Sequence, residues 1–285
     1  MAEQNKQSKY THGYSNYTTA THEQRTAEVD GAFLLPHIKK TDVILDVGCG
    51  PGTITTGFAK YASEGRVIGV DISTAVLAKA KTIAAEAKVP TSGPGSVTFE
   101  EGNILTGLAY PDNTFDVVFA SQVFGHLPPP DLPLKALIEI RRVLKPGGVV
   151  ATRDAGFQHF FPKSSNLDRL WVENQQKVVR KGSSADLDGT GPSMPALMRR
   201  AGFDADGDKV RIGAGSTVFS GAETRRWLAW RVAGQLKKGD QFYQGWLDAG
   251  ISKDEIAETV AAVQKWAETE DAWFASLQCE MLAWK

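Results

Sequence analysis

Three glycines in one five-residue turn are the residues of this chain whose spacing most directly predicts chemistry. Gly48, Gly50 and Gly52 follow the apolar run Val43–Val47, which is typical of a buried strand. A glycine has no Cβ, so the backbone can turn sharply there and come close to a ligand. A helix that starts at Thr53 would point its free N–H groups at the same ligand. The pattern predicts a strand, a ligand-binding turn and a helix.

Two aspartates near this turn indicate what kind of ligand it holds. Asp71 lies 19 residues after Gly52, at the end of a second apolar run, where a carboxylate can accept the hydroxyls of an adenosine ribose. Asp46 lies two residues before the first glycine, where it would repel a pyrophosphate but attract an ammonium or a sulfonium. The turn also has the spacing G-x-G-x-G, whereas dinucleotide-binding proteins have G-x-G-x-x-G. These residues favour a sulfonium nucleoside over a nicotinamide dinucleotide.

The segment Asp46–Gly52 resembles the first motif of the class I methyltransferases, which use S-adenosylmethionine. The resemblance continues in order along residues 43–153. It implies an α/β fold that is Rossmann-like and doubly wound, with a mostly parallel seven-stranded sheet. It also implies an N-terminal helical lid over residues 1–40, a cofactor-binding core over 41–153, and a helical substrate cap with the last sheet strands over 154–285. We expect these segments to form a single methyltransferase domain.

The residue patterns also predict where several elements begin and end. Val149–Arg153 is predicted to be the fifth strand, after which the chain leaves the sheet. Helical structure is expected from about His22, and Ser183–Pro195 is expected to be a polar loop. A strand with a glycine-rich interruption is expected between Val210 and Phe219, and Ser252–Glu255 is a capping box that opens a helix.

Both ends of the chain narrow the resemblance to one branch of this family. The segments Tyr10–Tyr14 and Arg25–His37 resemble the N-terminal part of the ubiquinone/menaquinone-biosynthesis methyltransferases. The ending Cys279–Lys285 resembles the last sheet strand of the same branch. The resemblance is specific for the cofactor, S-adenosylmethionine, and does not identify the methyl acceptor.

The resemblance also places a set of side chains around the cofactor. Asn103 stands where the family most often has an aspartate near the adenine amino group, and Ile104 is expected to cover the adenine ring. Arg25 would pair with the cofactor carboxylate or with an internal acid, and Cys49 is expected to be a small filler residue. The full set of expected cofactor-binding residues is Tyr14, Arg25, Asp46, Gly48, Cys49, Gly50, Gly52, Thr53, Asp71, Ile72, Gly102, Asn103, Ile104, Ser121, Gln122 and His126.

Three histidines are the candidates for a catalytic base. Methyl transfer is an in-line displacement, for which the protein aligns the reactants and excludes water. Acidic phenols, enols or thiols need little more, whereas alcohols, amines and unactivated carbon benefit from a base. His126 follows the predicted fourth strand, where cofactor and acceptor meet in the family, His159 lies in the aromatic cluster Phe157–Phe161, and His22 lies in the lid. Each also has an ordinary interpretation as a capping, packing or surface residue.

Aromatic side chains are the candidates for contacting the acceptor. All seven tryptophans lie after residue 170, which favours an apolar roof over the site. We expect Tyr14, Tyr17, Phe157 and Phe160 to contact the acceptor, with core or surface packing as the alternative for each ring. A tyrosine ring face also attracts a sulfonium. The predicted acceptor is a small apolar or aromatic molecule, methylated at O, C or N.

The composition argues against several other classes of function. The chain has 32 basic and 33 acidic side chains, so no net charge attracts nucleic acid. No apolar run reaches the roughly 18 residues of a membrane span, and the polar N-terminus lacks the core of a secretory signal, so we expect a cytoplasmic protein. The two cysteines form no disulfide framework, and no cluster has metal-ligand spacing. The sequence leaves a homodimer open.

Two other functions stay open at this point. A protein can bind S-adenosylmethionine without transferring its methyl group, as a sensor or as an enzyme of another reaction, and the lack of one obvious base keeps this alternative. A nicotinamide oxidoreductase is the second alternative, which Asp46 and the glycine spacing disfavour. Cofactor binding separates the oxidoreductase from the others, and only turnover separates a methyltransferase from a binding protein.

Overall fold

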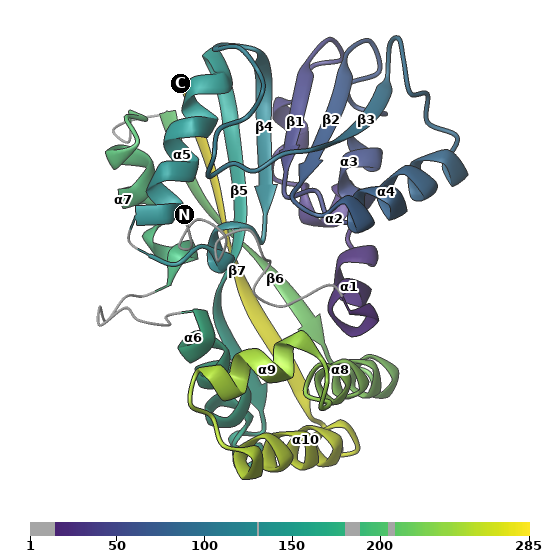
Figure 1. Cartoon of the computed structure of the whole chain (residues 1–285), viewed down its shortest axis with the longest axis vertical. Helices are drawn as coiled ribbons and strands as arrows, with labels where there is room; N and C mark the ends of the chain where they lie inside the picture. Colours follow the sequence, from purple (N-terminus) through teal and green to yellow (C-terminus); the bar gives the residue numbers. More distant parts are fainter. Residues whose placement is uncertain (1–14, 130, 180–188, 205–208) are drawn as a thin grey trace. The chain divides into compact units, whose positions relative to one another are not determined.

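A computed structural model describes residues 15–129, 131–179, 189–204 and 209–285. Its strands form one seven-stranded sheet in the order β3-β2-β1-β4-β5-β7-β6 (Figure 1). The strands are β1 (Val43–Val47), β2 (Arg66–Asp71), β3 (Ser96–Glu101), β4 (Phe115–Ser121), β5 (Leu144–Phe161), β6 (Val210–Phe219) and β7 (Trp273–Trp284). The order and the flanking helices confirm the predicted Rossmann-like α/β fold.

The order of the strands reverses at the centre of the sheet. The chain runs outward from β1 to β2 and β3, then returns to β4 on the other side of β1. All four pairs, β1 with β2, β1 with β4, β2 with β3 and β4 with β5, are parallel. In sheets of this kind, ligands bind beyond the carboxyl ends of the strands at such a reversal. The ends of β1 and β4 are therefore where a site is expected.

The helices that cover the strands lie between them in the chain. They are α1 (Asn16–Glu23), α2 (Ala27–Asp30), α3 (Thr53–Phe58), α4 (Thr74–Glu86), α5 (Asp131–Val143), α6 (Asn174–Val179), α7 (Thr190–Arg200), α8 (Ala222–Gln235), α9 (Gln241–Asp248) and α10 (Lys253–Ala267). Shorter turns are η2 (Leu35–His37), η3 (Phe124–His126), η4 (Lys163–Ser165) and the π-helical η5 (Asp168–Glu173). The predicted cap of α10 is confirmed, since Ser252 Oγ accepts from the Glu255 N–H at 3.1 Å.

The fold divides into two compact units. The larger unit comprises residues 22–154, 187–214 and 279–285, and the smaller unit comprises 1–21, 155–186 and 215–278. Along the chain, β5, β6 and β7 each continue from one unit into the other. The three continuous strands favour a single domain, whereas the division into two compact units favours two. The single domain expected from the sequence therefore stays a prediction.

Two hydrophobic clusters, one on each face of the sheet, hold the larger unit together. Side chains alternate along a strand, so on β1 Leu45 and Val47 belong to one cluster and Ile44 to the other. Leu137 of α5 packs in the first cluster and Phe58 of α3 in the second. Because both faces are covered, the strands of this unit are nearly continuous apolar runs, as the sequence predicted.

β5 is longer than the sequence analysis predicted. We expected the chain to leave the sheet after Arg153, but β5 continues to Phe161. Phe160 is 1% exposed, and its ring centroid lies 5.1 Å from that of Trp266 and 4.7 Å from that of Phe274. The aromatic cluster is thus a strand with one buried face, since its side chains alternate between the core and the surface.

Three other boundaries differ from the predicted ones. α1 begins at Asn16, although helical structure was expected from about His22. α7 begins at Thr190, inside the segment expected to be a polar loop, and includes Pro195. β6 is continuous where a glycine-rich interruption was expected. Glycine weakens a strand, but β6 has β7 beside it, and this pairing outweighs the local preference.

Replacing Phe160 by alanine is expected to lower the free energy of unfolding by about 3–5 kcal/mol, because it leaves a cavity between Trp266 and Phe274. Urea unfolding followed by circular dichroism measures this. The exposed Ile138 of α5 is the matched control, and its replacement by alanine should change stability by less than about 0.5 kcal/mol. Equal effects of the two substitutions would contradict the core position of Phe160.

Candidate active site

The candidate site lies in the larger unit, at the carboxyl ends of β1, β2 and β4 and beside the middle of β5. Val47, Ala120 and Thr152 are aligned across β1, β4 and β5. The residues that follow them are therefore at the same level of the sheet. Adjacent strands are about 4.8 Å apart, so Val47 of β1 and Thr152 of β5 are about 10 Å apart, which is the span of a small ligand.

The glycine turn after β1 has the backbone conformation that the sequence predicted. Gly48, Gly50 and Gly52 have φ values of 67°, 54° and 75°, in the left-handed region. A Cβ added to Gly48 would lie 2.7 Å from Val123, and one added to Gly52 would lie 2.7 Å from the Phe99 ring. A Cβ on Gly50 would have no neighbour nearer than 3.9 Å. A larger residue than glycine would therefore clash with neighbouring side chains at Gly48 and Gly52, whereas Gly50 leaves room for a ligand.

Asp71 ties this turn to the end of β2. It is buried, its Oδ2 accepts a hydrogen bond from the Gly50 N–H at 3.0 Å, and its Oδ1 accepts one from the Ser73 N–H at 3.0 Å. The Gly102 N–H, at the end of β3, donates to the Asp71 carbonyl at 3.1 Å. A carboxylate oxygen can accept more than one hydrogen bond, so ribose hydroxyls can share these two oxygens. Ile72, also expected at the cofactor, is half-buried beside Asp71.

Asp46 is a buried carboxyl group at the end of β1. Its Oδ2 accepts a hydrogen bond from Thr55 Oγ1 at 2.6 Å. Burial, with a smaller contribution from the charge of Asp71, raises the pKa of Asp46 to about 7. A cation beside this carboxyl would favour its ionised form. A buried carboxyl group at this position therefore suits a cofactor that carries an ammonium or a sulfonium.

Two residues of the turn have structural contacts. Burial raises the pKa of the Cys49 thiol well above its usual value, so the thiol is neutral, as expected for a filler residue. Thr53 Oγ1 donates to the carbonyl of His22 at 3.2 Å. His22 Nδ1 is also the atom nearest to the position of a Gly50 Cβ. The end of α1 therefore lies over the glycine turn, which fits the predicted lid.

In the loop after β3, the side chain of Asn103 forms a hydrogen bond with the backbone of the same loop. Asn103 Oδ1, expected to accept from an adenine amino group, accepts a hydrogen bond from the Leu105 N–H at 2.9 Å. Ile104, expected over the adenine ring, is buried in the hydrophobic cluster with Leu105 and Leu108. Sequence reasoning overlooked that an Asn followed by two apolar residues also forms a turn with its own backbone. The adenine contacts of both residues stay predictions.

His126 is half-buried in η3, shortly after β4. Burial, together with the nearby charge of Arg25, lowers the pKa of His126 to about 4. Its imidazole is therefore neutral at pH 7. An effective general base has a pKa near the working pH, so this environment does not favour His126 as the base. Gln122, which precedes η3, has a left-handed φ of 58° and its N–H donates to the Arg153 carbonyl at 2.7 Å.

Asp154, at the level of Gln122 on β5, is a site residue that sequence reasoning missed. It is 1% exposed, and its Oδ1 accepts a hydrogen bond from the Gly125 N–H at 3.0 Å. Its Oδ2 is buried and has no hydrogen-bond partner among the described residues. Burial raises the pKa of Asp154 to about 6, although the N–H groups of Gly125 and Phe124 and two nearby arginine charges oppose this. The signal in the sequence was weak, because Thr152 and Arg153 separate Asp154 from the apolar residues of the strand.

Ion pairs balance the charges around Asp154. Arg153 is buried, and its guanidinium lies 3.1 Å from Asp30 Oδ1 and 3.1 Å from Glu280 Oε1. The charge of Arg25 acts on both His126 and Asp154, and its pairing with the cofactor carboxylate or with an internal acid stays a prediction. At the end of β4, Ser121 Oγ is also buried and has no hydrogen-bond partner in the described part of the chain. Ser121 is aligned with Arg153, so its side chain points to the face of the sheet opposite that of Asp154.

Three other predicted residues, His159, Phe157 and Phe160, are part of the smaller unit. Tyr14 lies outside the described residues. His159 is on the surface of the smaller unit, where its Nδ1 lies 3.3 Å from Asp168 Oδ2. Phe157 of the same unit is exposed, whereas Phe160 is a core residue and has no free face for an acceptor. The roles predicted for His159 and Phe157 stay predictions.

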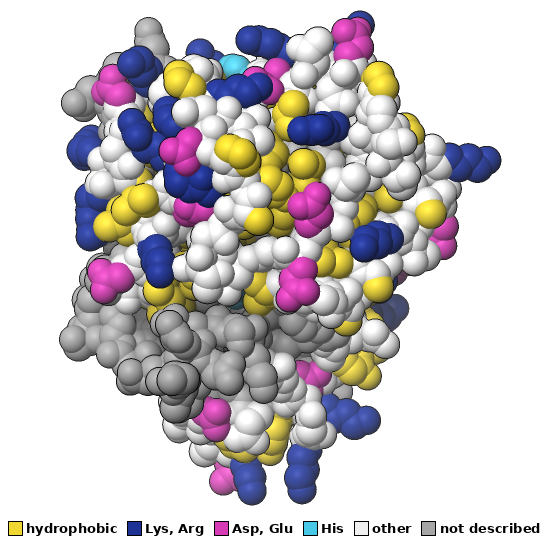
Figure 2. All heavy atoms as spheres, turned by 45° about the horizontal axis from the view of Figure 1, so that its top comes forward, with side chains coloured by type: hydrophobic (Ala, Val, Ile, Leu, Met, Phe, Trp, Pro, Cys, Tyr) yellow, Lys and Arg dark blue, Asp and Glu magenta, His cyan; other side chains and the backbone are white. Residues whose placement is uncertain are grey.

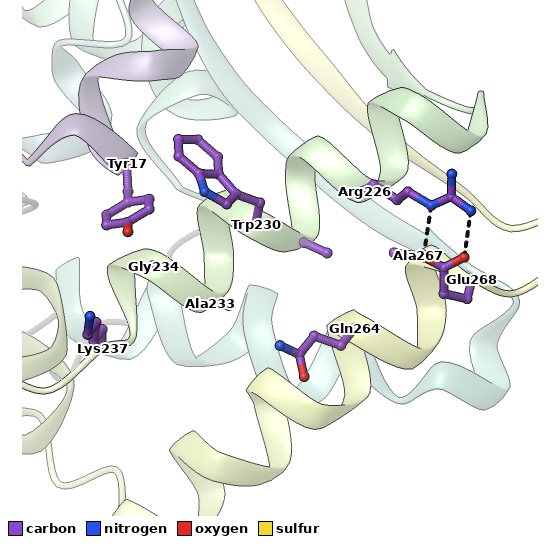
Figure 3. Close-up of a pocket in the computed structure, with 10 residues that line it drawn as sticks. Tyr17, Arg226, Trp230, Ala233, Gly234, Lys237, Gln264, Ala267 and Glu268 are labelled. Carbon is purple, nitrogen blue, oxygen red and sulfur yellow. Dashed lines mark hydrogen bonds and ion pairs between the residues drawn. The ribbon is translucent and has the colours of Figure 1, made fainter.

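Tyr17 lines an open groove of the smaller unit. Its ring packs on Gly234 of α8, where a Cβ would lie 2.1 Å from a ring carbon, and its centroid is 4.8 Å from that of Trp230. Figure 3 shows both rings at one end of the groove and the Arg226–Glu268 ion pair at the other. The cavity has a volume of about 570 Å³, a size typical of small-molecule sites.

The surface charges and the lengths of the helices concern two kinds of partner, nucleic acid and membrane. Basic and acidic side chains are interspersed on the face shown in Figure 2, in keeping with the balanced composition. In the described ranges, no helix is both long enough and apolar enough to span a membrane.

Comparisons with known proteins identify the family. The sequence model of a family described as a methyltransferase domain matches residues 38–197. The chain is 63% identical over 285 residues, covering 100% of both chains, to ltbC of Aspergillus luteorubrus, a protein named as a probable methyltransferase. This chain belongs to the methyltransferase family. The predicted enzyme class and its cofactor, S-adenosylmethionine, are confirmed with it.

Two further similarities concern the branch and the fold of this methyltransferase. Over 118 residues, 41% of this chain and 46% of the other, it is 37% identical to the ubiquinone/menaquinone biosynthesis C-methyltransferase UbiE of Bdellovibrio bacteriovorus. The predicted resemblance to that branch therefore holds over this part of the chain. The YcgJ protein of Bacillus subtilis superposes with a TM-score of 0.55 at 18% identity, over 89% of this chain and 97% of that one, which shows a shared fold.

Proposed function

We propose that this methyltransferase transfers the methyl group of S-adenosylmethionine to a hydroxyl group of a small apolar or aromatic molecule, by in-line displacement. The observation that supports a hydroxyl acceptor is the buried Oδ2 of Asp154, which has no hydrogen-bond partner among the described residues. A buried acceptor atom without a partner costs about 1–3 kcal/mol, so a ligand hydroxyl that donates to it would be bound favourably.

In this proposal the larger unit holds the cofactor. The Gly48–Gly52 turn leaves space at Gly50 for the nucleoside, Asp71 accepts its ribose hydroxyls, and Asp46 faces its positive charge. Arg25 and His22 lie on the segment that leads from α1 to the glycine turn. The cofactor supplies an activated methyl group on a positively charged sulfur. The protein then has to align the acceptor, exclude water and take up one proton.

Asp154 is the residue we assign to that proton. As the acceptor oxygen forms its bond to the methyl carbon, the bond between that carbon and sulfur breaks, and its electron pair stays on sulfur. The hydroxyl proton passes to Asp154 Oδ2. A carboxylate with a pKa of about 6 is ionised at neutral pH yet basic enough to accept this proton. The Gly125 N–H fixes Oδ1, so the orientation of Oδ2 is set in advance.

The polarity of the acceptor is inferred from the larger unit. Asp154 Oδ2 is a single buried acceptor atom, which suits one hydroxyl better than a highly polar substrate. The interspersed surface charges give no support for a nucleic-acid substrate.

The affinity for S-adenosylmethionine is expected to rise with pH by up to about tenfold between pH 6 and 8, because Asp46 loses its proton when a cation binds beside it. The affinity rises with pH because the pKa of Asp46 is about 7 in the free protein and a bound cation lowers it. Calorimetry in two buffers with different ionisation enthalpies should show proton release on binding near pH 6.5. Asp46→Asn should abolish this release, and Asp154→Asn should retain it; release that persists in Asp46→Asn contradicts the assignment.

Turnover with labelled cofactor tests the acceptor class. The protein is incubated with methyl-deuterated S-adenosylmethionine and four sets of small molecules, namely phenols, aliphatic alcohols, amines and carbon acids. Mass spectrometry then follows the labelled product and S-adenosylhomocysteine. The proposal predicts label on oxygen of hydroxyl-bearing molecules, and none with Asp71→Ala. Label on nitrogen or carbon alone would contradict the hydroxyl assignment.

A further inference from the structure

On one side of the strands in the smaller unit, no helix of the described residues covers the side chains. Phe160 of β5, Phe274 of β7 and Phe219 of β6 pack together toward the helices, with centroids 4.7 Å apart for the first pair and 5.9 Å for the last two. Side chains alternate along a strand, so their neighbours point to the opposite side. We call that side the bare face. Its residues are Phe157, His159 and Phe161 of β5, Trp273 and Leu277 of β7, and Val218 of β6.

The bare face is apolar and exposed to solvent. Phe157, Val218, Trp273 and Leu277 are 57%, 49%, 38% and 38% exposed, and they are half of the large exposed apolar residues in the described chain. Phe161 stacks on Trp273 with a centroid distance of 4.2 Å and an interplanar angle of 11°. This stacking shows that the side chains of β5 and β7 point the same way. Isolated exposed apolar residues are common, but a contiguous group of this kind marks an interaction surface.

The residue types on the bare face indicate the kind of partner. None of its six residues is a lysine, arginine, aspartate or glutamate, and His159 lies next to Asp168 at its margin. Nucleic acid and anionic lipid are bound through basic side chains, so neither fits this face. An uncharged apolar sheet face matches another uncharged sheet face, and two such faces pack about 10 Å apart.

We propose that two copies of this chain form a symmetric dimer through the bare face. A two-fold dimer joins the same patch of both subunits, so the patch must complement itself, and an uncharged apolar sheet face does so. The exposed rings and aliphatic groups present on the order of 400 Å² per copy, about half of the roughly 800 Å² per partner in a standard interface. The free edge of β6, the last strand of the sheet, supplies neighbouring surface for the remainder.

The Phe161–Trp273 stack is expected at the centre of this interface. Aromatic side chains dominate the energy of most interfaces, because they bury a large area at a small cost in conformational entropy. The two rings already hold each other in place, so little order is lost when a second copy covers them.

The oligomeric state tests this proposal without any ligand. Size-exclusion chromatography with light scattering is run from about 1 to 100 μM for the wild type, Phe157→Glu/Leu277→Glu and the control Ile138→Glu. Ile138 is also exposed and apolar but lies on α5, outside the bare face. We expect twice the chain mass for the wild type and the control at the highest concentration. The double variant should have the mass of one chain, with an unchanged circular dichroism spectrum.

A wild type of one-chain mass at every concentration, or a folded double variant of two-chain mass, would overturn the dimer. Binding of monomeric wild type to phosphatidylcholine vesicles would instead assign the bare face to lipid. If the double variant misfolds, hydrogen exchange of the wild type tests the dimer without any substitution. Amides of residues 157–161 and 273–277 should exchange more slowly at about 100 μM than at about 1 μM, and equal rates contradict the proposal. The dimer does not depend on methyl transfer, so cofactor titration tests the proposed function separately.

Discussion

Replacing Asp71 by alanine should weaken the binding of both S-adenosylmethionine and S-adenosylhomocysteine at least about 100-fold. The Asp71 carboxylate accepts hydrogen bonds from the Gly50 and Ser73 N–H groups at 3.0 Å each, and it is placed to accept ribose hydroxyls as well. Each hydrogen bond to a charged group contributes about 1.5–3 kcal/mol, so the loss of two already exceeds a hundredfold in affinity. Isothermal titration calorimetry measures the change for both ligands.

Two glycines of the neighbouring turn provide the control that separates binding from folding. Gly50→Ala places its methyl group in the space proposed for the cofactor, so it should reduce cofactor affinity at least tenfold. It should also lower the free energy of unfolding by roughly 1–2 kcal/mol, because alanine is strained in the left-handed conformation. Gly52→Ala places its methyl group 2.7 Å from the Phe99 ring and should mainly lower the melting temperature. The account is contradicted if Asp71→Ala binds both ligands within about threefold of the wild type.

Replacing Asp154 by asparagine should lower turnover by about 100- to 10,000-fold, the usual contribution of a general base. Asparagine keeps an oxygen for the Gly125 N–H but cannot take up the acceptor proton at neutral pH. For the wild type, the rate should rise with pH through about 6 and then level off, since only the ionised carboxylate accepts a proton. Asp154→Asn should lose this dependence. Steady-state kinetics from pH 5 to 8, with an acceptor found by the labelled-cofactor screen, measures both effects.

A purely structural role of Asp154 would give a different result. Cofactor affinity and melting temperature should stay close to those of the wild type in Asp154→Asn, because the hydrogen bond to η3 is retained. Asp112→Asn is the matched control, since Asp112 is an exposed surface carboxylate paired with Arg142. If Asp154→Asn lowered stability and cofactor affinity together with the rate, or kept the pH profile of the wild type, Asp154 would not be the base.

The cofactor end of the molecule was predictable because its signals are local. Left-handed turns need glycine, a buried parallel strand needs an apolar run, and a helix follows such a turn at once, so Gly48–Gly52 and Asp71 were placed correctly from the sequence. The capping box at Ser252 was found for the same reason, since its residues are three apart.

The acceptor end was less predictable because its properties arise from tertiary burial. The pKa of His126 depends on how deeply η3 is buried and on the nearby Arg25, and no spacing in the sequence encodes either. Asp154 becomes a candidate base only because folding buries Oδ2 without a hydrogen-bond partner among the described residues. Phe157 and Phe160 look alike in the sequence, yet one is exposed and the other is in the core, since β5 extends through both.

The most direct test of the central claim is a calorimetric titration of the wild-type chain with S-adenosylmethionine, S-adenosylhomocysteine and NADH. The structure predicts one site with micromolar affinity for both sulfur nucleosides and no measurable heat with NADH, because the Gly50 turn and the Asp46 carboxyl suit a cationic nucleoside rather than a pyrophosphate. Binding of NADH alone, or of none of the three, would contradict the assignment of this site to S-adenosylmethionine.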